Sequence, residues 1–174
     1  MSRNEPVEYL PLRKKKRRMS EQEAWELLVS RRTEYGCLGT HGVAAENGMP
    51  YCIPMNFAAD PAGKALFLHT TIDTDSKRNL AIEQNPAVTF VVVDPGSVIR
   101  QDADGTACRY SMDFTSVMVF GIAEKIEDPS KKAAALNLMM MQKTTGDFIE
   151  VEASHTAIAT IYKINVDHIS GAKK

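Results

Sequence analysis

The sequence predicts a mainly β fold in which six antiparallel strands close into a barrel with a few flanking helices. Apolar segments of strand length recur along the chain, and tight-turn signals such as Asn47-Gly48 join several of them. Segments typical of helices are few and short. Closure into a barrel hides the strand edges that six strands in an open sheet would expose.

The composition is that of one globular domain, and it excludes several classes of protein. The 174 residues are 44% hydrophobic and 25% charged, with a net charge of −1, so no overall field attracts nucleic acid. No apolar run approaches a membrane span, and no apolar core follows the charged N-terminus as in a secretory signal. The three cysteines, Cys37, Cys52 and Cys108, form no CxxC pair. We therefore expect a cytoplasmic protein with no membrane partner, no disulfide framework and no metal site.

Residues 1–18 form a basic N-terminal extension, which ends in the unbroken basic run from Arg13 to Arg18. This run is either a nucleic-acid or anionic-surface patch, or a solvated segment before the first helix. The second interpretation is favoured because no aromatic residues interleave and no second basic cluster exists. Ser20 and Glu23 then form a capping box, which predicts a helix to about Arg32 with Gly36 marking its end.

A meander of three strands is predicted next, and its second strand contains a proline. The strands are Cys37–Ala45, Pro50–Ala59 and Lys64–His69, joined by turns at Asn47-Gly48 and Asp60–Gly63. Pro54 cannot donate to a strand ladder, so it marks an edge, a bulge or a backbone that faces a ligand. A plain bulge is favoured on the strand pattern alone.

The remaining elements follow from apolar patterns, caps and turn residues. A helix at Asp75–Gln84 is followed by a fully buried strand at Ala87–Val93 and a long exposed loop or lid at Asp94–Thr106. A strand at Cys108–Ile126 has a bend or bulge at Gly121, and a helix at Pro129–Lys143 is capped by Asp128 and packs through Leu136, Met139 and Met140. The last strand is Ala157–Val166, and the end at Ser170–Lys174 is frayed.

The segment from Leu66 to Pro86 is a candidate anion cradle. A strand ends at His69 and Thr70, and Ser76, Lys77 and Arg78 fall in the first turn of the following helix. Hydroxyls, cations and free N–H groups at a helix N-terminus favour an anion. The alternative is that Thr74 or Asp75 caps the helix while the two cations are solvated, and the carboxylates of Asp73 and Asp75 would repel a phosphate.

Familiar catalytic motifs are absent from the sequence. There is no GxGxxG after a strand, no P-loop, no HExxH and no GxSxG, and the histidines His41, His69, His155 and His168 are scattered. Hydrolase, kinase and metalloenzyme functions are therefore disfavoured. A bound cofactor could carry the chemistry that these side chains do not supply.

Several segments in order resemble one family. They are Tyr35-Gly36-Cys37-Leu38-Gly39-Thr40, Asn47 to Phe57, Leu66 to Thr70, Ser76-Lys77-Arg78-Asn79-Leu80, Asn85 to Val88, Thr115 to Ala123 and Ile126-Glu127-Asp128. Together they resemble the pyridoxamine 5′-phosphate oxidase-like split β-barrel flavoproteins, most closely the nitroimidazole-resistance (Nim-like) branch. The resemblance spans residues 17–171.

The resemblance implies a homodimer with FMN, or in some relatives FAD, at the subunit interface; other relatives bind haem. It implies an FMN-binding domain at residues 19–171, followed by a tail at 172–174. The implied cofactor contacts are Pro54, Met55 and Asn56 against the flavin ring, His69 and Thr70 near the ring and ribityl chain, Ser76, Lys77 and Arg78 at the phosphate, Ser116 and Val117 from a later strand or the partner subunit, and Thr40 as a further candidate.

Three departures from the family pattern limit what is carried over. Thr115 stands where the Nim-like branch often has arginine, and Asp73 and Asp75 stand where relatives are commonly Gly-rich, which could weaken FMN affinity. The ending Asp167–Gly171 lacks the Trp- and Arg-bearing end of true pyridoxamine phosphate oxidases, so no vitamin B6 oxidation is predicted.

The predicted function is a flavin-dependent oxidoreductase that passes electrons to a small acceptor such as a nitroaromatic. The alternative is a flavin or haem carrier or sensor without turnover. His69 is either a catalytic group or a hydrogen-bonded wall residue.

Overall fold

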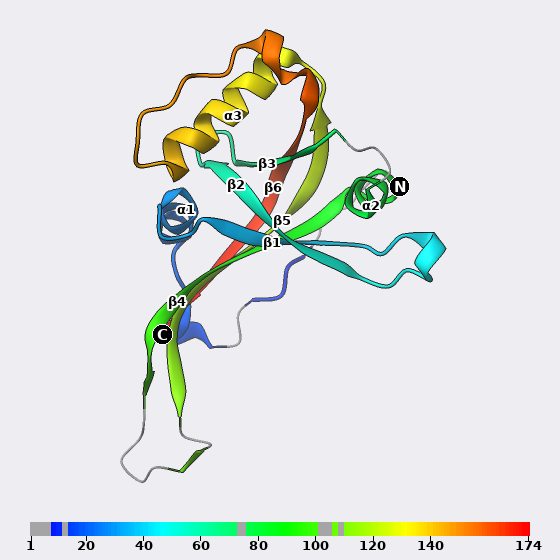
Figure 1. Cartoon of the computed structure of the whole chain (residues 1–174). Helices are drawn as coiled ribbons and strands as arrows, with labels where there is room; N and C mark the ends of the chain where they lie inside the picture. Colours follow the sequence, from blue (N-terminus) through cyan, green and yellow to red (C-terminus); the bar gives the residue numbers. More distant parts are fainter. Residues whose placement is uncertain (1–7, 12–13, 73–75, 101–105, 108–109) are drawn as a thin grey trace.

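The fold is a closed six-stranded antiparallel barrel with flanking helices, as predicted (Figure 1). The computed structural model describes residues 8–11, 14–72, 76–100, 106–107 and 110–174. The strand order around the barrel is β1-β2-β3-β6-β5-β4. The strands are β1 Tyr35–Thr40, β2 Tyr51–Asp60, β3 Ala65–Thr71, β4 Ala87–Arg100, β5 Ser111–Ile126 and β6 Ala159–Lys173; the helices are α1 Glu21–Val29, α2 Lys77–Gln84 and α3 Pro129–Lys143, with short 3-10 turns η1 Lys15–Arg17, η2 Ala44–Glu46 and η4 Ala153–Ile158.

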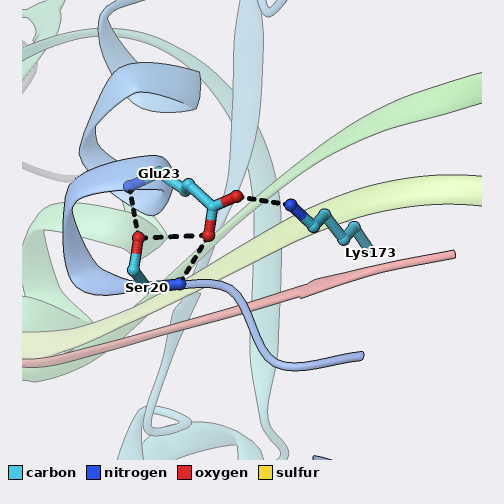
Figure 2. Close-up of polar contacts among 3 residues, drawn as sticks. All are labelled: Ser20, Glu23 and Lys173. Atoms are coloured by element: carbon cyan, nitrogen blue, oxygen red, sulfur yellow. Dashed lines mark hydrogen bonds and ion pairs between the residues drawn. The ribbon is translucent and has the colours of Figure 1, made fainter. Parts of the chain in front are cut away.

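Helix α1 begins at the predicted capping box. The Glu23 amide donates to Ser20 Oγ at 3.2 Å, and the Ser20 amide donates to the Glu23 carboxylate at 2.8 Å (Figure 2). The helix ends at Val29, before the predicted Arg32, because the backbone of Ser30 is extended, with ψ 151°; its amide makes the last helical hydrogen bonds, to Glu26 O and Leu27 O. Gly36 therefore does not mark its end and lies inside β1.

The hairpin of β1 and β2 turns at the predicted Asn47-Gly48. Both residues have positive φ, at 56° and 69°. The turn is not the predicted tight one, because Asn47 caps η2 and the last strand pair is Thr40 with Tyr51, so residues 41–50 connect the strands. Strand β1 ends at Thr40 and not at Ala45, because Ala44–Glu46 forms the 3-10 turn η2.

Strand β4 is longer and less buried than the sequence predicts. Asp94–Arg100 continues the strand and pairs with β5, so the predicted loop is wrong for these residues; 101–105 lie outside the described residues. A register shift after Pro95 accommodates the proline, which a regular ladder would not. The described strand residues alternate, with Val92 buried and Val93 50% exposed, because only one face meets the core. Beyond the barrel, β4 and β5 project as an arm (Figure 1).

Strand β6 corrects the predicted end of the chain. Ser170 pairs with Met118 and Lys173 pairs with Thr115, so the prediction of fraying from Ser170 is wrong. Residues 157–158 belong to η4 and not to the strand. The bulge predicted at Gly121 is confirmed by a register shift between Phe120 and Gly121.

Helix α3 has the predicted bounds, with the Asp128 carboxylate accepting from the Lys131 amide at 2.8 Å. Its packing face differs from the prediction. Met139 is buried, but Met140 is 41% exposed, and the other buried side chains are Ala133 and Ala135. Among the described residues, no helix is long and apolar enough to cross a membrane.

Candidate functional site

The barrel opens between β2 and β3. The two strands pair only where Phe57–Asp60 meets Ala65–Leu68. Beyond Phe57, β2 stays beside β1 while β3 stays beside β6 as far as Thr71, so the strands diverge (Figure 1). A groove of about 660 Å³ lies at this opening, lined by Tyr35, Pro54, Met55, Asn56, His69, Thr70, Thr71 and Arg78.

The strand register explains the proline in β2. Residues opposite each other in an antiparallel pair alternate between hydrogen-bonded and non-hydrogen-bonded positions. Pro54 lies opposite Cys37 and has no N–H, so this pair is of the second kind. The ladder with β1 therefore loses no hydrogen bond at Pro54. The nitrogen of Pro54 faces the other edge of β2, where pairing with β3 has stopped. The N–H donor is thus missing only on the side of the groove.

At one end of the groove, Arg78 gathers polar groups from two elements. Its Nη2 donates to Thr70 Oγ1 of β3 and to Ser76 Oγ at 3.4 Å, and its Nε donates to Asn79 Oδ1 at 3.3 Å. No described carboxylate forms an ion pair with this guanidinium. The arrangement holds a fixed cation beside two hydroxyls, which suits an anionic group.

The N-terminus of α2 is capped by Ser76, whose Oγ accepts from the Asn79 amide at 3.3 Å. The alternative cap at Thr74 or Asp75 is therefore wrong. Residues 73–75 lie outside the described part of the chain, so the predicted repulsion by Asp73 and Asp75 has no structural test.

His69 lies in the groove wall next to Arg78. Burial, and to a smaller extent the charge of Arg78, lowers the pKa of His69 below its usual value. This shift favours the neutral imidazole at pH 7. A neutral imidazole presents one donor and one acceptor nitrogen, so it can hydrogen-bond a ligand or exchange a proton with it.

Other predicted cofactor contacts lie away from the groove lining. The Lys77 ammonium forms an ion pair with Glu46 and sits 4.9 Å from the centre of the Tyr51 ring. Thr40 is buried at the far end of β1, and its hydroxyl has no hydrogen-bond partner in the described structure. On β5, Ser116 pairs with Val93, and the Val117 side chain is fully buried in the core.

Two groove residues were missed by the sequence analysis. Tyr35 is 61% exposed and lies directly opposite Asn56, and Thr71 follows Thr70 on β3. The predicted turn could not have identified Tyr35, because a two-residue turn at Asn47-Gly48 would place Gly39 opposite Asn56, whereas the longer connection places Tyr35 there.

The comparison with protein families decides the assignment. A family model described as pyridoxamine 5′-phosphate oxidase matches residues 20–173. The chain belongs to this family. No curated protein matches the sequence.

Solved structures share the fold at low identity. A proposed 5-nitroimidazole antibiotic resistance protein from Bacteroides thetaiotaomicron is 23% identical, with a TM-score of 0.70 over 88% of this chain and 84% of that one. The flavocytochrome Anf3 from Azotobacter vinelandii is 21% identical, with a TM-score of 0.73 over 94% and 72%. An FAD and haem binding protein from Mycobacterium smegmatis is 18% identical, with a TM-score of 0.68 over 89% and 71%. At these identities the likeness shows the fold alone.

Proposed function

We propose that the groove between β2 and β3 binds a flavin, FMN or alternatively FAD, and that the protein is a cytoplasmic flavin-dependent oxidoreductase acting on small acceptors such as nitroaromatics. The observation that carries the proposal is a single groove that has Arg78, bonded to Thr70, at one end and the strand segment containing Pro54 along its side. Family membership supports it, as do neighbours described as binding FAD or haem.

The groove residues suit an anionic, flat ligand. Its volume of about 660 Å³ falls in the range typical of cofactor sites, roughly 300–1,000 Å³. Among the described residues of the lining, Arg78 is the one cation and none is a carboxylate. A phosphate can therefore replace the contacts of Arg78 with Thr70 and Ser76 by charge-assisted hydrogen bonds.

Each residue has a distinct role in this proposal. A bound flavin supplies the two-electron chemistry that the side chains lack. Arg78, Thr70 and Ser76 bind its phosphate, and Pro54, Met55 and Asn56 orient the ring along an edge that offers no N–H at Pro54. His69, whose neutral form is favoured at pH 7, holds a proton beside the ring or serves as a hydrogen-bonded wall. Lys77 contributes to the phosphate site only if it leaves Glu46.

A second copy of the chain is the proposed partner that closes the groove. Exposed apolar side chains surround the open side and the base of the arm: Tyr35, Ile72, Val93 and Met118 are 37–61% exposed. Burial of such side chains favours association. In the homodimer, Ser116 of β5 would approach the partner's cofactor, whereas the predicted Val117 is buried in the core. Light scattering after gel filtration, with and without FMN, tests for the dimer, and a monomer under both conditions would contradict it.

The deciding experiment is cofactor binding by the purified protein and by Arg78→Ala. The wild type should bind FMN or FAD with the absorbance bands of a bound flavin. Removal of charged hydrogen bonds costs about 1.5–3 kcal/mol each, so Arg78→Ala should weaken binding at least about tenfold. Lys125→Ala removes an exposed cation outside the groove and should leave affinity unchanged. A wild-type protein that binds neither flavin refutes the proposal.

The neutral His69 favours one alternative, a flavin or haem carrier or sensor without turnover. A neutral imidazole is a common metal ligand, so it could ligate haem iron. A Soret band that disappears in His69→Ala would indicate haem binding. A bound flavin that no nicotinamide nucleotide reduces would indicate a carrier.

A further inference from the structure

Two cysteines share the outer face of the β1–β2 hairpin beside the groove. Cys37 lies opposite Pro54, and Cys52 lies two residues before Pro54 on the same face of β2. Cys52 is exposed and Cys37 is partly buried, and both are free thiols. Tyr35, two residues from Cys37, lines both the groove and a cavity of about 380 Å³ that Cys37 also lines.

The two thiols are diagonal neighbours and affect each other. Burial is the largest cause that raises the pKa of Cys37, and the neighbouring Cys52 thiol raises it further. Cys37 is thus the poorer nucleophile at neutral pH, whereas Cys52 is exposed to solvent-borne reagents. The pair therefore has an accessible thiol that reacts first and a shielded thiol next to it that reacts second.

The edge of β2 has room to adjust at this place. Residues 51–56 pair with β1 alone, since the described pairing with β3 begins at Phe57. Diagonal neighbours in a regular ladder have Cα atoms about 7–8 Å apart, slightly more than the roughly 4.4–6.8 Å of relaxed disulfides. A bond between the thiols must draw β2 toward β1, and a strained disulfide of this kind is easily reduced.

We propose that Cys37 and Cys52 are a redox-active pair that forms a reversible disulfide and fastens the groove edge of β2 to β1. The oxidant is a low-molecular-weight disulfide such as oxidised glutathione. The Cys52 thiolate attacks one of its sulfurs, forms a mixed disulfide and releases one glutathione thiolate. Cys37 then loses its proton to solvent and attacks Cys52 Sγ, and the second glutathione thiolate leaves. Two electrons pass from the protein to the oxidant.

The test uses the full chain with Cys108→Ser, freed of any cofactor, so its result does not depend on flavin binding. Incubation with oxidised glutathione should remove two hydrogen atoms from the intact mass, and peptide mapping should join Cys37 to Cys52. When Cys37→Ser is added to this protein, the reaction should stop after one glutathione has bonded to Cys52. When Cys52→Ser is added instead, the protein should stay largely unmodified under the same conditions. Reduced glutathione should restore the mass of the untreated Cys108→Ser protein.

Hydrogen exchange distinguishes a disulfide that holds β2 against β1 from one that leaves the strand unchanged. The amides of residues 51–53, 55 and 56 should exchange more slowly in the oxidised protein than in the reduced one. Stable addition of two glutathiones, an internal bond that forms only in denaturant, or unchanged exchange at these amides would each overturn the proposal.

Discussion

The two sides of the barrel use their strands in opposite ways. Strands β5 and β6 pair from Thr115–Lys173 to Ile126–Ile161, interrupted only at the Gly121 bulge. Strands β2 and β3 pair over Phe57–Asp60 alone and then separate. The continuous ladder satisfies its backbone groups internally and holds the fold, whereas the opening leaves edges and side chains for a ligand. Changes on the first side should therefore alter stability, and changes on the second should alter binding.

The largest effect is expected at the Gly121 bulge. A Cβ at Gly121 would lie 2.1 Å from Asn165 O, whereas a Cβ at Gly39 would lie 3.6 Å from Thr89 O, an ordinary contact. We expect Gly121→Ala to lower the free energy of unfolding by about 3 kcal/mol or more, because backbone must shift to accept the methyl group. Urea denaturation measures it.

Gly39→Ala is the matched control for this change. It adds the same methyl group to a barrel strand without the clash, so the expected change is below about 1 kcal/mol. Equal losses for the two variants would show that strand propensity, and not the bulge, decides the cost.

The continuous side was only partly predictable from sequence, and the reason is physical. The capping box at Ser20 is a local signal, and the structure confirms it. A turn forms at Asn47-Gly48, but the connection between its strands is longer than the predicted tight turn. Pro95 and Ser170–Lys173 lack local strand character, and their pairing depends on a partner strand far along the chain. Long-range pairing of this kind leaves no mark in a short window of sequence.

The groove was predictable to a similar degree. The proline and the hydroxyl-cation sequence after β3 pointed to Pro54, His69, Thr70 and Arg78, which the fold brings together. The position of Lys77 was not predictable, because Glu46 belongs to the β1–β2 connection and meets Lys77 only after folding.

A second effect on stability is expected where α3 meets α1. Lys143 Nζ donates to the carbonyls of Leu28, Ser30 and Thr33 at 2.7–3.3 Å, and it lies 4.2 Å from the centre of the Phe57 ring. Burial lowers the pKa of Lys143 to about 8, so it remains mostly protonated at pH 7. Lys143→Met should cost about 2 kcal/mol, because three carbonyls lose their donor.

Thermal or urea unfolding at pH 7 measures this cost, with Lys131→Met on the exposed face of α3 as control. A cost no greater than that of the control would mean that water replaces the ammonium at no penalty. Flavin affinity should not change in either variant, since both residues lie outside the groove.

On the open side, Thr70→Val should alter binding more than stability. Its Oγ1 accepts from Arg78 Nη2, so the isosteric valine removes the hydroxyl that orients the guanidinium. Loss of one such hydrogen bond costs about 1 kcal/mol, so FMN affinity should fall about fivefold. Thr70→Ser keeps the hydroxyl and should restore most of it. Equal weakening by both variants, measured by titration calorimetry, would mean that loss of the hydroxyl does not account for the effect of Thr70→Val.

The smallest effect is expected at the surface link between the end of β6 and α1, and it depends on pH. The hydrogen bond from Lys173, and to a smaller extent those from Ser20, lower the pKa of Glu23 from 4.5 to about 2 (Figure 2). A depressed carboxyl pKa stabilises the fold above pH 4.5, and this contribution is lost as pH falls toward 2. Glu23→Gln should therefore be less stable than wild type at pH 6, and the difference should shrink in acid. Unfolding curves between pH 6 and pH 3 test this. A difference that is constant with pH would mean that the lost cap, and not the charge, accounts for the change.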